Sequence, residues 1–316
     1  MALDHAEMLR RMLLIREFDS RLAKLYTRGL IRGSSHPATG QEAVAAGSCA
    51  ALRRDDYITS THRGHGHAIA KGANPKRMMA ELLGRSDGYC RGKGGSMHIA
   101  DFSVGMLGAN GIVGGGIGLA GGAALSSVVR GDDRVAVCFF GDGALNKGVF
   151  HEVSNMAGVW QLPLVLLCEN NQYAMSARVD RMTCISDLER RADAFGFPSA
   201  TVDGMDPLAV HDAVSQAVAR CRGGGGTSLI VANCYRFDGH FSGDTMRYRS
   251  SAEAEPWRER DPLVTFRARL IADGVLDEPA ADALQAAVKD EIDEAVAFAI
   301  DSPLPDPAEA WEHVVA

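Results

Sequence analysis

Two polar motifs each follow a continuous apolar run, which is the pattern of a buried strand that ends in a functional loop. Gly141-Asp142-Gly143 follows RVAVCFF, and Asn170-Asn171 follows LPLVLLC. Asp142 and Asn171 are separated by about 30 residues, the length of one strand-helix-strand unit, so both are expected at the carboxyl ends of parallel strands. Carboxylate and amide oxygens suit Mg²⁺, and the flanking glycines let the backbone approach a diphosphate. Singly, each motif is more typical of a turn or a solvated loop; together they predict a metal and diphosphate site.

A formal dinucleotide-binding fingerprint competes with this interpretation. Gly116-x-Gly118-x-x-Gly121 has the required glycine spacing. That fingerprint needs a preceding strand and an acidic residue about 20 positions later. These glycines instead lie in IVGGGIGLAGGAAL, which is typical of a helix of small residues that packs closely, so we do not expect NAD binding.

The elements that must position these motifs form an alternating pattern. Short apolar runs alternate with helical patterns, and this arrangement predicts a parallel sheet covered by helices on both faces, hence an α/β fold. The expected strands cover residues 57–60, 134–140, 162–168, 200–202 and 228–234, and the expected helices cover 4–26, 41–52, 75–84, 149–160, 187–195, 207–220 and 279–300. We therefore divide the chain into an N-terminal helical extension (1–55), a cofactor-binding α/β domain (56–248) and a C-terminal helical extension (249–316).

Composition excludes several classes of protein. The 316 residues include 40 acidic and 33 basic side chains, a net charge of −7 that argues against general nucleic-acid binding. Charges throughout the first 20 residues do not resemble a signal or transit peptide, and no apolar stretch is long enough to span a bilayer, so we expect a cytoplasmic protein with no membrane partner. The seven cysteines form no C-x-x-C pair and are expected to be buried structural thiols. The 35 glycines indicate close backbone approaches or tight turns.

Several further motifs occur in a fixed order along the chain. They are GSSHPATGQEAVAAG, THRGHG, GKGGSMH, NGIVGGG, GDGALNKG, CENNQYAMS and RFDGHFSGD. This series resembles the α subunit of the two-subunit, thiamine diphosphate-dependent dehydrogenases that act on 2-oxo acids or acetoin, and the resemblance runs from the first helix to about Arg249. It implies a thiamine diphosphate-binding fold with thiamine diphosphate and Mg²⁺ as cofactors.

The resemblance also assigns roles to residues. The Mg²⁺ ligands would be Asp142, the side chain of Asn171 and the backbone carbonyl of Tyr173. Arg63 would bind the diphosphate with its guanidinium fork, and residues 111–113 would bracket the aminopyrimidine. The implied cofactor-binding set is His62, Arg63, Gly111, Val113, Gly141, Asp142, Gly143, Ala144, Asn171 and His240.

Histidines complete the expected site. His240 and His65 are predicted to be catalytic, because a loop histidine with a pKa near neutrality can bind the diphosphate or move protons. His62 stands where the family often has tyrosine. We expect His36, His62, His65, His98 and His240 to lie in loops that can face a cleft, and the roles of His36 and His98 stay open.

One component of thiamine chemistry is absent from the chain. In these enzymes a glutamate from a second domain activates the aminopyrimidine, whereas this sequence encodes a single sheet. The resemblance therefore implies a β subunit that supplies the glutamate, an active site between subunits and an α2β2 tetramer. It further implies a small carbonyl substrate and transfer of the acyl group to a lipoyl-bearing acyltransferase.

The substrate branch depends on the segment GHFSGDTMRYR. It resembles the acetoin dehydrogenases, because Phe241 stands where pyruvate dehydrogenases have serine, and we expect no phosphorylation switch there. An anion at Asp238 would repel a carboxylate substrate and favour neutral acetoin, unless Asp238 pairs with Arg236 or Arg247.

Three alternatives to an acetoin dehydrogenase α subunit stay open. They are an α subunit for pyruvate or a branched-chain 2-oxo acid, a split transketolase-like subunit, and a non-catalytic partner that retains the fold.

Overall fold

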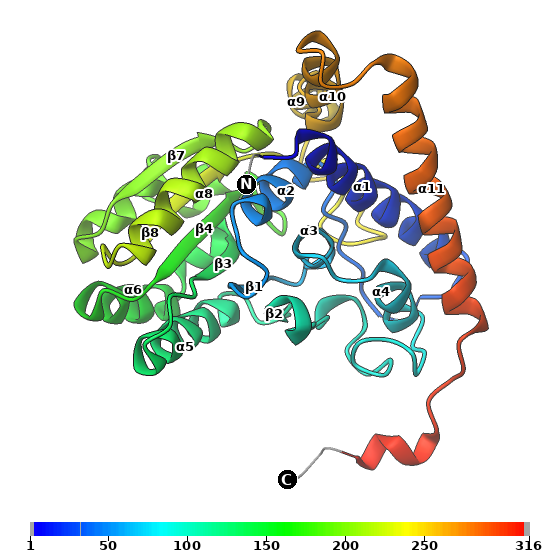
Figure 1. Cartoon of the computed structure of the whole chain (residues 1–316), viewed down its shortest axis with the longest axis horizontal. Helices are drawn as coiled ribbons and strands as arrows, with labels where there is room; N and C mark the ends of the chain where they lie inside the picture. The colour runs from blue at the N-terminus through cyan, green and yellow to red at the C-terminus, as the bar shows by residue number, and fades with distance from the viewer. Residues whose placement is uncertain (1–2, 32, 313–316) are drawn as a thin grey trace.

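A six-stranded parallel sheet forms the centre of the computed structural model, which describes residues 3–31 and 33–312. The strand order is β2-β1-β3-β4-β8-β7, and Figure 1 shows helices on both sides of the sheet. The strands are β1 (Tyr57–Thr59), β2 (Met106–Gly108), β3 (Ala136–Gly141), β4 (Leu164–Asn170), β7 (Ser199–Asp203) and β8 (Ser228–Asn233). The predicted α/β class is confirmed.

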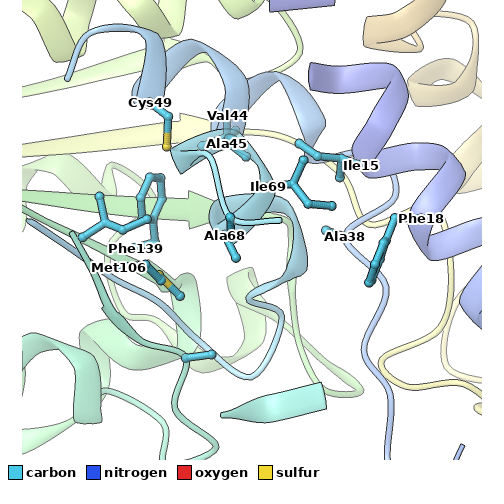
Figure 2. Packing of buried hydrophobic residues seen from close by; sticks show 14 of the residues in the cluster. Ile15, Phe18, Ala38, Val44, Ala45, Cys49, Ala68, Ile69, Met106 and Phe139 are labelled. Atoms are coloured by element: carbon cyan, nitrogen blue, oxygen red, sulfur yellow. The ribbon is translucent and has the colours of Figure 1, made fainter. Parts of the chain in front are cut away.

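Alternate residues of the central strands face two separate cores. Val137 and Phe139 of β3 belong to the core on the side of α2 (Glu42–Ala50), α3 (His65–Lys71) and α8 (Pro207–Arg222). Figure 2 shows Phe139 of β3 together with labelled side chains of α1, α2 and α3. Cys138 and Phe140 face the opposite core, built with α5 (Gly115–Arg130) and α6 (Gly148–Trp160). Because both faces are buried, the strands are continuous apolar runs in the sequence.

The terminal helices pack on the α2–α3 side. Figure 1 shows α1 (His5–Thr27) lying alongside α11 (Glu278–Asp301), and α1 also contacts α2 and α3. Helix α11 packs against α4 (Pro75–Leu82) as well. The remaining elements are α7 (Val179–Met182), α9 (Ser251–Arg258), α10 (Pro262–Ala272), the β5–β6 hairpin (Tyr173–Ala174 and Ala177–Arg178) and short 3₁₀ helices. The division into a domain and two extensions stays a prediction.

The small-residue segment that mimics a dinucleotide fingerprint is helix α5, as expected. A Cβ atom built on Gly121 would lie 2.9 Å from Val153 Cγ1 of α6, so this glycine permits close packing of the two helices. Several elements differ from expectation. The edge strand β2, helix α3, the β5–β6 hairpin and helix α7 were not predicted, and residues 188–195 form a 3₁₀ helix.

The structure also tests the expectations that the cysteines are buried and that no segment spans a membrane. Five of the seven cysteines are buried, but Cys184 is exposed and Cys90 is half-buried, so the prediction of buried thiols is wrong for Cys184. Across the described ranges, the structure contains no helix with both the length and the apolar character of a membrane span.

Candidate active site

A cavity of about 330 Å³ opens at the carboxyl edge of the sheet, where β1, β3 and β4 end. This is the edge to which parallel topology brings the loops that follow each strand. The cavity is lined by all the residues predicted to bind the cofactor or the metal: His62, Arg63, Gly111, Val113, Gly141, Asp142, Gly143, Ala144, Asn171, Tyr173 and His240. Of the predicted site residues, His65 alone is not part of this lining.

The carboxylate of Asp142 lies at the start of a short 3₁₀ helix, Asp142–Asn146, directly after β3. Its side chain is buried, and burial raises the pKa of Asp142 to about 6. It forms no salt bridge with any residue that the structure describes. A buried carboxylate without a cationic partner is costly unless a cation binds there, so Asp142 fits a metal ligand.

Asn171 and Tyr173 complete the predicted metal-binding set. Both residues are buried, and the backbone N–H of Tyr173 donates to Asn171 Oδ1 over 3.3 Å. Gly143 has a packing reason to be glycine, because a Cβ atom there would lie 2.7 Å from the Ala174 Cβ of the adjoining strand β5. A carboxylate, an amide oxygen and a carbonyl are the oxygen donors that Mg²⁺ takes in proteins.

Two buried guanidinium groups flank the same cavity. Arg63 donates to the carbonyl oxygens of Pro37 and His240, and Arg236 donates to Met175 O at 2.9 Å and Tyr248 Oη at 2.8 Å. Within the described ranges neither arginine forms a salt bridge. Burial, and next to it the charge of Arg236, lowers the pKa of Arg63 to about 9. Two buried cations without counter-ions fit an anionic ligand such as a diphosphate.

Three imidazole rings meet at this end of the cavity, those of His36, His62 and His240. Their centroids lie 4.6 to 5.1 Å apart. Burial lowers the pKa of His36 to about 3, of His62 to about 2 and of His240 to about 4, with the Arg63 charge as the second cause. All three rings are therefore neutral at physiological pH.

The spacing of one nitrogen from each ring, within 4.8 Å of the others, would allow a metal ion. The hydrogen bonding of His240 argues against one. Arg236 can only donate, so its 3.3 Å contact makes His240 Nδ1 an acceptor and leaves the proton on Nε2. The Nδ1 lone pair of His240 is therefore already used, and the guanidinium groups of Arg63 and Arg236 lie nearby. For these two reasons the three-histidine cluster suits an anionic or neutral ligand better than a cation.

His65 corrects an expectation. It was expected in a loop facing a cleft, but it is the first residue of α3 and is fully buried. Its Nδ1 contacts Asp19 Oδ1 at 2.8 Å and its Nε2 contacts Ser96 Oγ at 2.9 Å. This order matches a serine-histidine-aspartate triad, but Ser96 is buried and lines no described cavity. Asp19 Oδ2 also accepts from Ala38 N at 2.5 Å, so the network connects α1, α3, the loop at Ala38 and the 3₁₀ helix Gly95–Met97.

Sequence reasoning gave no role to some residues that line the cavity. Gln41 Oε1 accepts from Asn171 Nδ2 at 3.0 Å, and Glu169 contacts His67 Nε2 at 3.2 Å. Gln41 and Arg236 stand inside two of the quoted motifs, GSSHPATGQEAVAAG and RFDGHFSGD. Their buried polar contacts, which no spacing rule predicts, are the signal that identifies them.

Two residues left open by the sequence lie outside the cavity lining. Asp238 is exposed, its Oδ2 accepts from Thr39 Oγ1 at 2.5 Å, and its carboxylate forms no salt bridge with Arg236 or Arg247 in the described structure. Arg236 Nε donates instead to the Asp238 backbone carbonyl at 3.3 Å. The expected repulsion of a carboxylate substrate by Asp238 therefore has no support from its position. His98 is exposed.

The fold and the cavity together define an α/β protein with a cavity of buried charged groups at the carboxyl ends of parallel strands. The chain belongs to the dehydrogenase E1 component family, whose model matches residues 10–308. The family is thiamine diphosphate-dependent, and its members are oxidoreductase components.

Relatives cover nearly the whole chain. It is 46% identical to the α subunit of acetoin:2,6-dichlorophenolindophenol oxidoreductase from Bacillus subtilis, over 96% of this chain and 90% of that protein. It is 45% identical to the subunit of the same name from Cupriavidus necator, over 94% and 90%. It is also 40% identical to the pyruvate dehydrogenase E1 component α subunit of Porphyra purpurea, over 96% and 91%. All three relatives are α subunits of multi-subunit enzymes, which implies a partner subunit.

Proposed function

We propose that this chain is the cytoplasmic α subunit of a thiamine diphosphate- and Mg²⁺-dependent acetoin dehydrogenase. One observation carries the cofactor assignment: a cavity at the strand ends combines the carboxylate of Asp142 with the guanidinium groups of Arg63 and Arg236, and none of the three forms a salt bridge with a described residue. This arrangement leaves one negative and two positive buried charges for a ligand to neutralise, as a metal diphosphate does. The acetoin assignment rests on the names of two relatives and on the segment around Phe241.

The residues of the cavity divide into those that would hold the metal and those that would hold the anion. Asp142, Asn171 Oδ1 and the Tyr173 carbonyl would ligate Mg²⁺, while Arg63 would bind the diphosphate. When bound, thiamine diphosphate supplies a thiazolium carbon that attacks the substrate carbonyl. His240 presents Nε2–H and, being neutral, can hold or exchange a proton at that atom during the reaction.

The buried histidine of α3 would act through other residues. His65 does not line the cavity, so we replace the direct catalytic role expected for it with a positioning role. Through Asp19 it holds the backbone of Ala38, and through Ser96 it holds the residue next to the cavity-lining Met97. Its expected effect on the reaction is therefore indirect.

A β subunit would complete the site. Ile112 and Val113 line the cavity and are exposed, which suits a mouth covered by another subunit in an α2β2 tetramer. That subunit would supply the glutamate that activates the aminopyrimidine, and the product acyl group would pass to a lipoyl-bearing acyltransferase. Pyruvate or a branched-chain 2-oxo acid is the second candidate substrate, because the E1 α subunit of Porphyra purpurea is named for pyruvate dehydrogenase.

The test is substrate profiling of the complex with a β subunit encoded beside this chain. With dichlorophenolindophenol as electron acceptor, acetoin should be turned over faster than pyruvate or 2-oxoisovalerate. Asp142→Ala should reduce activity at least 100-fold and abolish Mg²⁺-dependent cofactor binding, whereas the surface variant Asp55→Ala should not. Turnover of pyruvate without acetoin activity would contradict the substrate assignment, and full activity of Asp142→Ala would contradict the site. Sugar phosphate conversion without lipoamide would instead favour a transketolase-like enzyme.

A further inference from the structure

Gln41 connects the N-terminal helices to the predicted metal site. It is the residue before α2, its side chain is 1% exposed, and it lines the cavity. Its Oε1 accepts a hydrogen bond from Asn171 Nδ2 over 3.0 Å, across 130 positions of sequence. No role in the reaction follows from this residue's position in the sequence alone.

Hydrogen bonding fixes which atom of the Asn171 amide faces each neighbour. The Tyr173 N–H can only donate, so the atom it contacts at 3.3 Å must be Asn171 Oδ1. The other amide atom, Nδ2, then needs an acceptor, and Gln41 Oε1 provides it. Reversing the Asn171 amide would place two donors against each other at Tyr173 and two acceptors at Gln41. Gln41 thus keeps Asn171 Oδ1 on the side of the Tyr173 backbone.

The same contact determines the orientation of the Gln41 side chain. Because Oε1 is occupied by Asn171, Nε2 must point away from it. Gln41 Nε2 is shielded from solvent and has no hydrogen-bond partner among the described residues. An unpaired buried donor is costly, and this one belongs to a residue that lines the cavity.

We infer that Gln41 is a binding residue of the metal-diphosphate site: its Oε1 fixes Asn171 with Oδ1 available to the metal, and its Nε2 donates to a diphosphate oxygen. This inference rests on the proposed function. It adds to that site a side chain from the segment before α2, which the sequence places in a helical extension. A residue that only packed would not change how cofactor binding depends on the Mg²⁺ concentration, whereas the role inferred for Gln41 predicts such a change.

The test measures how tightly thiamine diphosphate binds to the complex of this chain with the β subunit. Binding is monitored by fluorescence over a range of Mg²⁺ concentrations. Gln41→Met keeps a similar side-chain shape, but the thioether has no donor and accepts hydrogen bonds only weakly. It should raise both the half-saturating Mg²⁺ concentration and the cofactor Kd about tenfold or more, as expected for the loss of a hydrogen bond to a charged group. Ser48→Ala is the matched control: Ser48 is buried in α2 and its hydroxyl donates to Val44 O within the same helix, so neither value should change.

A second background separates positioning from general damage. In Asn171→Asp the side chain has two equivalent oxygens, so its orientation no longer matters to the metal. Gln41→Met should then raise the half-saturating Mg²⁺ concentration by less than twofold in the Asn171→Asp background. An equal increase in both backgrounds would overturn the positioning role, and unchanged binding by Gln41→Met alone would overturn the whole inference.

Failure of the inference is distinguishable from failure of the proposed function. If the wild-type complex binds the cofactor with Mg²⁺ and Gln41→Met binds it equally well, only the role of Gln41 is wrong. If the wild-type complex does not bind thiamine diphosphate at any Mg²⁺ concentration, the proposed function itself is wrong. The thermal midpoint of each ligand-free variant, measured in parallel, identifies any variant whose fold is altered.

Discussion

The imidazoles of His36, His62 and His240 lie in a cavity with Arg63 and Arg236, which form no salt bridge with any described residue. Burial and these charges hold the pKa of each ring well below the value of about 6.5 found in an unfolded chain. The unfolded state therefore binds protons between pH 6.5 and about 4 that the folded state excludes. By linkage, the three rings make the free energy of unfolding fall as the pH falls through this range.

Replacing one ring should reduce this pH dependence. For His62, whose folded pKa is about 2, one excluded proton lowers the free energy of unfolding by about 2 kcal/mol between pH 7 and pH 5. Between pH 7 and pH 5, the free energy of unfolding of the ligand-free His62→Asn chain should therefore fall by about 2 kcal/mol less than that of the wild type. The measurement is urea unfolding at both pH values, and it compares the two changes because other groups titrate as well.

The His211→Asn variant is the control, because this half-buried ring lies on α8 and is not part of the cavity lining. Equal pH dependence of wild type and His62→Asn would show that the ring is protonated in the folded protein. That result would contradict the neutral cluster.

Individual residues of the site were predictable where topology alone brings them together. Asp142 and Asn171 follow strands that are neighbours in the sheet, so the parallel order determines that they meet. His65 was misplaced because glycines on both sides of it are typical of a loop. In the structure these glycines serve packing: a Cβ atom on Gly66 would lie 3.3 Å from Ile15 Cγ2 of α1, and one on Gly64 would lie 2.7 Å from Ala109 Cβ.

At the scale of elements, one carboxylate organises the glycine-rich segment at residues 88–98. Glu81 of α4 is fully buried. Its two oxygens accept hydrogen bonds of 2.7 to 3.0 Å from four backbone amides, those of Cys90, Gly92, Gly94 and Gly95. Four donors compensate the buried charge without a cation. This segment carries Ser96 and Met97 to the edge of the cavity.

Glu81→Gln should loosen this segment. The new amide nitrogen replaces one oxygen and faces two N–H donors, so two part-buried amides lose their acceptor at a cost of about 2 to 4 kcal/mol. Hydrogen exchange of a peptide covering residues 88–98 should become at least tenfold faster, and the cofactor Kd should rise. The surface variant Glu294→Gln, which removes an exposed pair with Lys76, should change neither. Unchanged exchange in Glu81→Gln would show that the segment holds its conformation without this carboxylate.

The elements that the sequence missed have local physical reasons. Strand β2 is only Met106–Gly108, too short for any periodicity to indicate a strand, and it forms at the edge by pairing with β1. The contacts of Glu81 join a helix to a loop whose glycines have no side chains to give a pattern. Long apolar runs, by contrast, predicted β3, β4 and β8 because the strands are buried on both faces.

At the scale of the whole molecule, an exposed face of α5 continues from the mouth of the cavity. Ile112 and Val113 are exposed at the mouth, and Leu119 of α5 is 51% exposed. Gly118 and Gly122 are exposed on the same helix. Among the described residues outside the helix's own backbone, no atom lies within 4 Å of a Cβ built at Gly122, and a Cβ at Gly118 meets Val149 Cγ2 at 3.9 Å. Small residues at a four-residue spacing beside an apolar side chain let another helix approach closely. If the β subunit completes the site at the mouth, this face is where it should pack.

A substitution on this face can stabilise the chain and still prevent assembly. Gly122→Leu removes a glycine from a helix interior, which favours the helix by about 0.5 to 1 kcal/mol, and its side chain points into open space in this chain. The thermal midpoint of the isolated chain should therefore stay level or rise. The same side chain would fill the surface that a partner helix needs, so the Kd for the β subunit should rise at least 100-fold by analytical ultracentrifugation. Val129→Glu, at the far end of α5 and 78% exposed, is the control and should assemble normally. Assembly of Gly122→Leu with wild-type affinity would exclude this face as the interface, whereas loss with Val129→Glu alone would move the interface to the other end of the helix.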